Sequence, residues 1–170
     1  LPNQLPVSLN PENDLMELAG VLKLVAPPEH IEGFDISSIS GTFMVASMVV
    51  FRNGRPANGD YRKYKIKGVS AQDDFACMAE AVKRRYSRLK KGGRPMPDLI
   101  LIDGGKGQLS SAVKSLSELG LEKLQIIGLA KEFEEIYKPR CKEPIRLGLD
   151  NNALRLLQRI RDESHRFANS

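Results

Sequence analysis

The sequence predicts an α/β fold with a mixed sheet, in which three antiparallel strands are followed by parallel strands and helices flank the sheet. Two patterns support this fold class. Segments rich in β-branched and aromatic residues fill the first part of the chain, whereas amphipathic helical patterns separated by short apolar runs fill the rest. The chain has 170 residues, the length of one compact domain with a full hydrophobic core.

Residues 1–30 are predicted to form a lead-in helical segment, and residues 31–170 the main domain. The amphipathic stretch at residues 15–24 predicts a helix. Pro27 and Pro28 end it, because proline cannot continue a helix.

Three antiparallel strands are expected next, at residues 31–37, 42–52 and 61–67. Asn53 and Gly54 supply the turn after the second strand. The third strand alternates polar and apolar side chains, so it completes a meander.

The rest of the chain alternates helices and strands. Ser70, with Asp73 three residues later, predicts a capping box and a helix reaching about residue 89. The apolar face of this helix is predicted to carry Phe75, Met78, Ala79, Val82 and Tyr86.

Short apolar runs at residues 98–103 and 124–130 predict two strands, and residues 108–119 a helix between them, which implies a parallel crossover. Residues 133–147 are predicted to form an extended hairpin. Asn151 or Asn152 can cap a last helix that reaches about residue 167. This order of elements is that of a ribonuclease-H-like fold.

Composition narrows the class of protein. Apolar residues make up 41% and charged residues 28%, which is ordinary for a globular protein, and no apolar run approaches the ~20 residues of a membrane-spanning helix. We therefore expect no membrane association. Cys77 and Cys141 lack the spacing of zinc or redox motifs, so we expect reduced thiols and a cytoplasmic location. The net charge of +5 favours a polyanionic partner without specifying one.

Two aspartates stand out against their strands. Asp35 lies inside a strand suited to burial, where an unpaired carboxylate is costly, and Asp103 ends a buried strand. If the strands are neighbours, the two carboxylates converge on a site for Mg²⁺ or Mn²⁺, cations that prefer oxygen ligands. The structural alternatives are a salt bridge for Asp35 and a helix cap or turn for Asp103.

A third candidate is His165 on the last helix. Leu154, Leu157, Arg161 and His165 recur at steps of three and four, so the imidazole points toward the sheet. A lone histidine there is more often a satisfied core residue than a ligand. Alongside two aspartates, it could complete a metal site or relay a proton.

The glycine-rich residues 104–108 follow a strand and open a helix, but they lack the spacing of a nucleotide-binding loop, so no nucleotide cofactor is expected. Lys106 could still contact a DNA phosphate. Tyr61, Arg62 and Lys63 interleave an aromatic ring with cations, which suits nucleic-acid binding or a solvated strand edge. Arg155 and Arg161 share the helix of His165 and could hold a phosphate.

Four blocks of the sequence resemble the UvrC family. They are GFDIS at residues 33–37, LIDGGKGQL at residues 101–109, GLAK at residues 128–131 and RDESHRFA at residues 161–168, in the family's order and at similar separations. The resemblance implies the half of UvrC that makes the 5′ incision in damaged double-stranded DNA during nucleotide excision repair. It carries the family's catalytic triad over to Asp35, Asp103 and His165.

The resemblance also implies that other domains of the family lie outside this chain. The chain opens at Leu1 without methionine, so we expect a piece of a longer protein, without the N-terminal nuclease domain, the UvrB-binding segment and the helix-hairpin-helix domain of the family. UvrB is expected as a partner through those parts. The competing reading is a non-catalytic nucleic-acid or protein-binding module with a ribonuclease-H-like fold, in which the acidic residues serve only hydrogen bonding.

Overall fold

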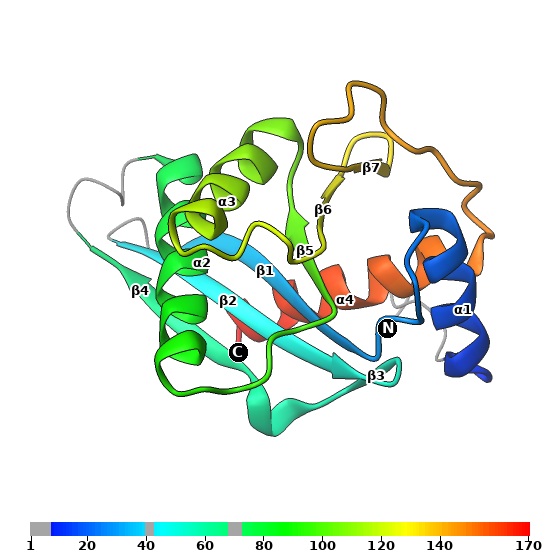
Figure 1. Cartoon of the computed structure of the whole chain (residues 1–170), viewed down its shortest axis with the longest axis horizontal. Coiled ribbons are helices and arrows are strands. Elements are labelled where there is room, and N and C mark those ends of the chain that lie inside the picture. Colours follow the sequence, from blue (N-terminus) through cyan, green and yellow to red (C-terminus); the bar gives the residue numbers. More distant parts are fainter. Residues whose placement is uncertain (1–7, 40–42, 68–72) are drawn as a thin grey trace.

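The computed structural model describes residues 8–39, 43–67 and 73–170. A seven-stranded sheet forms its centre, in the order β3-β2-β1-β5-β6-β7, with β4 also paired to β2 (Figure 1). Helices α2 and α3 lie in front of the sheet in Figure 1 and α4 lies behind it. This confirms the predicted α/β fold class, a mixed sheet flanked by helices.

The antiparallel part of the sheet contains β1 (His30–Ile39), β2 (Phe43–Arg52) and β4 (Arg62–Ile66). β2 pairs with β1 on one side and with β4 on the other, which confirms the meander. Two small elements were not predicted: strand β3 (Arg55–Pro56) and the 3₁₀ turn η1 (Asn58–Asp60). Both are too short to produce a periodic pattern.

The parallel part joins the strands that carry the two aspartates. β5 (Leu99–Asp103) pairs parallel with β1, and β6 (Ile126–Ala130) pairs parallel with β5. α3 (Lys106–Glu118) connects β5 to β6, as predicted.

The predicted hairpin at residues 133–147 is only partly correct. β7 (Glu135–Tyr137) pairs antiparallel with β6 and extends the main sheet. The second arm of the hairpin is reduced to one bridge between Ile136 and Ile145, which exchange backbone hydrogen bonds. β7 therefore pairs with the edge of β6 on one side and keeps a short contact with the predicted hairpin arm on the other.

The start of α2 (Asp74–Lys91) differs from the predicted capping box. Asp73 itself caps the helix, because its carboxylate accepts hydrogen bonds from the backbone N–H groups of Phe75 and Ala76. Ser70, the predicted cap, lies outside the described residues. Phe75 is half exposed instead of lying on the buried face.

Helices α1 (Pro11–Leu22) and α4 (Asn152–Ala168) pack against each other. Leu15, Leu18 and Leu22 of α1 belong to the same hydrophobic cluster as the strands, so α1 adds to the core of residues 31–170. Asn151 is the N-cap of α4. In the described part of the chain, no helix combines the length and apolar character needed to cross a membrane.

Candidate metal centre

Strand β1 brings Asp35 to the middle of the sheet by alternation. Side chains of a strand point to opposite faces in turn, so Asp35 lies on the face opposite Glu32 and Phe34. Phe34 packs its ring against Tyr86 of α2, at 5.9 Å between ring centroids. Asp35 is therefore directed to the α4 face, where it is only 8% exposed.

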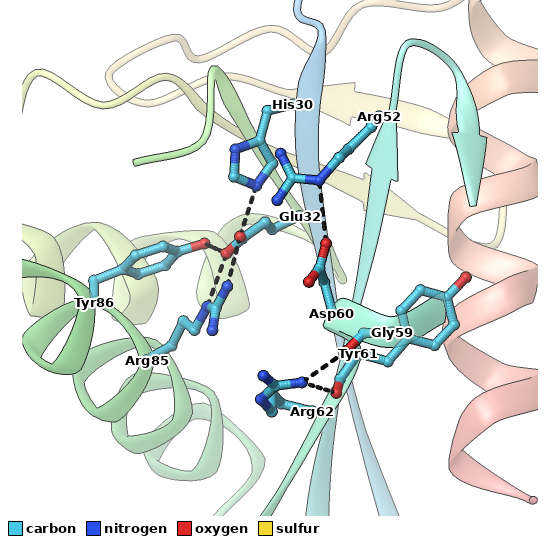
Figure 2. Close-up of polar contacts among 9 residues, drawn as sticks. All are labelled: His30, Glu32, Arg52, Gly59, Asp60, Tyr61, Arg62, Arg85 and Tyr86. Carbon is cyan, nitrogen blue, oxygen red and sulfur yellow. Dashed lines mark hydrogen bonds and ion pairs between the residues drawn. The ribbon is translucent and has the colours of Figure 1, made fainter. Parts of the chain in front are cut away.

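Buried Glu32 fixes the start of β1. Its carboxylate accepts hydrogen bonds from the Arg85 guanidinium and the Tyr86 hydroxyl of α2 and contacts the His30 imidazole at 2.8 Å (Figure 2). Burial alone would raise the pKa of Glu32, but these partners lower it to about 2. Glu32 is thus an ionised anchor, three residues before Asp35 on the same strand.

Asp103 stands beside Asp35 because of the strand register. Phe34 pairs with Ile102 across β1 and β5, so the next residues of these parallel strands, Asp35 and Asp103, are neighbours. The chain leaves the strand sharply after Asp103: Gly104 has φ of +155°, and an added Cβ there would lie 2.4 Å from Cγ of Gln108. Only glycine fits this exit toward α3.

His165 approaches both carboxylates from α4. Its Nε2 lies 2.6 Å from Oδ2 of Asp103 and 3.5 Å from Oδ1 of Asp35. The last helix thus turns its imidazole toward the sheet, as the spacing of its apolar residues predicted. The three residues that the sequence analysis singled out from distant segments meet at one point.

The three groups share protons unequally. Hydrogen bonds with Asp103 and then with Asp35 raise the pKa of His165 to about 9, against the effect of burial. Burial is the largest influence on both aspartates, and by itself it would raise the pKa of each. The pKa of Asp35 does lie above its ordinary value, and the neighbouring Asp103 charge adds to this rise. The pKa of Asp103 lies below its ordinary value, because His165 and Lys131 stabilise the charged carboxylate more than burial destabilises it.

The donor set fits a divalent cation. One oxygen from each aspartate and one nitrogen of His165 lie within 4.8 Å of one another. Ligands at about 2.1 Å from one ion are separated by roughly 3 Å when adjacent and roughly 4 Å when opposite, so small movements of these side chains would bring all three onto one ion. His165 would move slightly away from Asp103 and lose its proton, because a ligand imidazole is neutral.

Arg161 lies one helical turn before His165 and is tied to Glu134. Its NH2 nitrogen donates to Glu134 at 2.9 Å and its NH1 nitrogen to the other carboxylate oxygen at 2.5 Å. The Arg161 side chain is only 12% exposed. Burial raises the pKa of Glu134 and lowers that of Arg161, but the hydrogen bonds between them outweigh burial, so the pKa of Glu134 lies below its ordinary value and that of Arg161 above. The nearby Asp103 charge adds a smaller upward influence on both.

The other predicted DNA-binding residues lie at different places. Lys106 is the exposed first residue of α3, with its Nζ 5.6 Å from the ring centroid of Tyr137. Arg155 lies in the first turn of α4, and its Nε donates to the Leu149 carbonyl at 3.2 Å. Ten residues separate it from His165, about 15 Å along the helix, so the structure does not bring it to the triad.

Tyr61, Arg62 and Lys63 lie beside the end of α4. Tyr61 is 7% exposed, its hydroxyl donates to Glu163, and its ring packs against Phe167, so no face is open for a stacked base. Arg62 donates to the Gly59 and Tyr61 carbonyls (Figure 2). Lys63 contacts the carbonyl of Ser170. Arg62 and Lys63 keep exposed side chains.

Two residues near the triad received no role from the sequence. Lys131 follows β6 directly, at the edge where β5 ends, and the rule that located Asp103 also applies to it. Glu134 has a left-handed backbone, with φ of +51°. No sequence pattern identifies Glu134, because its position depends on that turn and on Arg161 from another element.

Comparisons with known proteins place the chain in a family. A family model described as the UvrC RNase H endonuclease domain matches residues 19–169. UvrABC system protein C of Dehalococcoides mccartyi strain CBDB1 is 54% identical over 159 residues, which is 91% of this chain and 26% of that protein. The protein of the same name from Methanococcoides burtonii is 55% identical over 156 residues, again 91% of this chain and 26% of the relative. The chain spans about a quarter of the length of these curated relatives.

Solved structures with a similar chain trace include human ENDOV, at 14% identity and a TM-score of 0.48, covering 94% of this chain and 98% of that one. A Ciona intestinalis endonuclease V crystallised with inosine-containing DNA has 20% identity and a TM-score of 0.45, covering 71% of this chain and 55% of that chain.

Proposed function

The chain belongs to the UvrC RNase H endonuclease domain family, and from that premise we propose that it hydrolyses phosphodiester bonds in damaged double-stranded DNA. In nucleotide excision repair it would make the 5′ incision. The expected products carry a 3′-hydroxyl and a 5′-phosphate.

The meeting of Asp35, Asp103 and His165 carries the proposal. Two carboxylates on neighbouring strands and an imidazole from the helix behind them suit Mg²⁺ or Mn²⁺, of which Mn²⁺ accepts imidazole more readily. When bound, such an ion would activate water for attack and stabilise negative charge on the phosphate.

The chain's own residues would prepare the reacting groups. Asp35 and Asp103 supply the oxygen ligands, on strands locked side by side in the sheet. His165 holds a proton at Nε2 against Asp103 before the ion arrives, and it is placed to give or take a proton during hydrolysis. Lys131 adds positive charge beside Asp103, where a phosphate would lie, while the charge of Arg161 is balanced by Glu134.

The partners of the whole protein belong to the same proposal. The chain covers about a quarter of its relatives, so damage recognition and the approach of UvrB would reside in other parts of a complete UvrC protein. We place the reaction in the cytoplasm, where bacterial DNA is repaired. No nucleotide cofactor is proposed, because the loop after Asp103 lacks the P-loop pattern.

Incision of a damaged duplex tests the function. A complete UvrC protein carrying Asp35→Asn, Asp103→Asn or His165→Ala at the corresponding positions should lose the 5′ cut and keep its folded circular dichroism spectrum. Normal 5′ cutting by a variant would refute the role of that residue. Normal cutting by all three would favour the non-catalytic module.

A further inference from the structure

A groove outside the metal centre gathers unpaired positive charge. It has a volume of about 1080 Å³ and runs along α3, between that helix, the start of β6 and residues 138–142. In Figure 1 the walls are α3 and the chain that follows β7. We call it the α3 groove. Its lining includes one carboxylate, Glu122, and six cations: Lys106, Lys114, Lys123, Lys138, Arg140 and Lys142.

None of these cations is held in a salt bridge within residues 8–39, 43–67 and 73–170. Five of the six are exposed, whereas Lys138 donates to the Leu22 carbonyl at 3.0 Å and thereby fixes one wall to the end of α1. Like charges around one hollow repel each other, and a polyanion relieves this repulsion.

The α3 groove begins next to the metal centre. Lys106 lines it and stands three residues after Asp103, at the amino end of α3. That helix end has no side-chain cap, so its free backbone N–H groups and dipole also favour an anion. From Lys106 to Ser117 the groove follows α3 for about 17 Å, which corresponds to about five base pairs of duplex.

We propose that the α3 groove binds the phosphate backbone of the DNA duplex that flanks the incision. The inference rests on the proposed nuclease function, because it assigns a path to the same substrate. The groove would bind the duplex beside the cut, and the triad would carry out the hydrolysis. Phosphate contacts carry little sequence information, which suits an enzyme that must cut beside damage in any sequence.

Salt-dependent binding tests the proposal without requiring catalysis. A fluorescent duplex is titrated with the 170-residue chain in the presence of EDTA at several salt concentrations. Replacing Lys114, Lys123 and Lys142 by glutamine should weaken binding and reduce the slope of log affinity against log salt by about 2 to 3, since each phosphate contact contributes about 0.9.

A matched variant controls for total charge. Lys83→Gln, Lys91→Gln and Arg88→Gln remove three exposed charges from α2, outside the groove lining. This variant should keep nearly the full slope. An equal fall in both variants, or no fall in the groove variant, overturns the proposal.

Cross-linking tests the same path without a change of charge. Cys141 is an exposed member of the lining and Cys77 is buried, so a thiol-reactive photocrosslinker can be attached at Cys141. Irradiation should join it to the duplex, and Cys141→Ser should abolish the product. Cross-linking to polyglutamate but not to duplex would overturn the proposal in favour of an acidic protein.

Incision separates this proposal from the nuclease function. In a complete UvrC protein, the groove variant should raise the DNA concentration needed for half-maximal 5′ cutting and leave the rate at saturation unchanged. If the groove variant cuts fully and binds duplex as tightly as the native protein, only the groove proposal is overturned. If the native protein itself makes no 5′ cut, the nuclease function is overturned, and the EDTA titration still tests whether the groove binds duplex.

Discussion

Gly33 of β1 lies directly against Ile160 of α4, so closely that an added Cβ would stand 2.7 Å from Cγ2 of Ile160. No positive φ is involved here, so the requirement is for space alone. The contact sets how near α4 comes to the sheet. His165 lies on the same helix, five residues after Ile160, and its reach to Asp103 depends on that distance.

Gly33→Ala should therefore damage the metal centre from a distance. The methyl group pushes α4 outward, and a shift of several tenths of an ångström weakens the His165 contact. We expect cleavage and Mn²⁺ affinity to fall by about tenfold or more, with destabilisation of about 1–3 kcal/mol from overpacking. Urea unfolding and calorimetry measure these two effects.

Two further variants check this explanation. Ile160→Leu removes the Cγ2 methyl at nearly constant volume, so Gly33→Ala with Ile160→Leu should recover most of the lost metal affinity. Gly59→Ala, where an added Cβ has no neighbour within 4 Å, should have little effect. An additive double variant would contradict the steric account.

Buried Glu32 should make stability depend on acidity. Its pKa is about 2 in the folded protein, against an ordinary value of 4.5. A lowered carboxyl pKa gives stability that is present above 4.5 and is lost as the pH falls toward 2. At pH 7 the contribution is about 3 kcal/mol, so Glu32→Gln should lower the free energy of unfolding by that order.

The test is urea unfolding of the native protein and the Glu32→Gln variant across this range. The difference between the two should be largest at neutral pH and should shrink below pH 4.5. A difference that stays constant down to pH 2 would show that ionised Glu32 is not the source of the stability.

The pair of Glu134 and Arg161 should regulate charge at the metal centre. Glu134→Gln leaves the Arg161 guanidinium uncompensated near Asp103, and its repulsion should weaken Mn²⁺ binding by about tenfold at an effective dielectric constant of about 20. Adding Arg161→Gln should restore the affinity, as calorimetry can measure. If the double variant binds no better than Glu134→Gln, the pair acts through the shape of the loop.

Asn151 should stabilise α4 through its cap. Its side chain accepts hydrogen bonds from the N–H groups of Ala153 and Leu154, and Asn151→Ala should cost about 1 kcal/mol of stability. Neighbouring Asn152 is exposed inside the helix, so Asn152→Ala should be neutral or slightly stabilising. Equal losses in thermal unfolding would contradict the cap assignment.

The fold was predictable where the sequence pattern is distinct. Strands β1, β2 and β5 are runs rich in apolar residues and helices α3 and α4 have helical spacing, and their predicted bounds differ from the observed ones by only a few residues. The pairing of β7 with β6 was not predictable, because the hairpin pattern involves only one edge of the strand. The other edge of β7 was free to join the open edge of β6.

The candidate site was predictable for a similar reason. Asp35 and Asp103 oppose the apolar character of their strands, and His165 lies on a packed helix face. Charged residues on the surface have polar neighbours in the sequence, so the pattern does not single out those that bind DNA. The sequence alone could not tell that Arg161 meets Glu134 or that the Tyr61 ring is buried, because both contacts join segments far apart in the chain.

Mn²⁺ titration calorimetry of the 170-residue chain tests the central claim most directly. Asp35→Asn and Asp103→Asn should each weaken Mn²⁺ binding by about tenfold or more, which is about 1.4 kcal/mol, whereas Asp150→Asn, an exposed carboxylate in the loop before α4, should bind like the native chain. Native-like Mn²⁺ affinity in both site variants would contradict a metal centre formed by Asp35, Asp103 and His165.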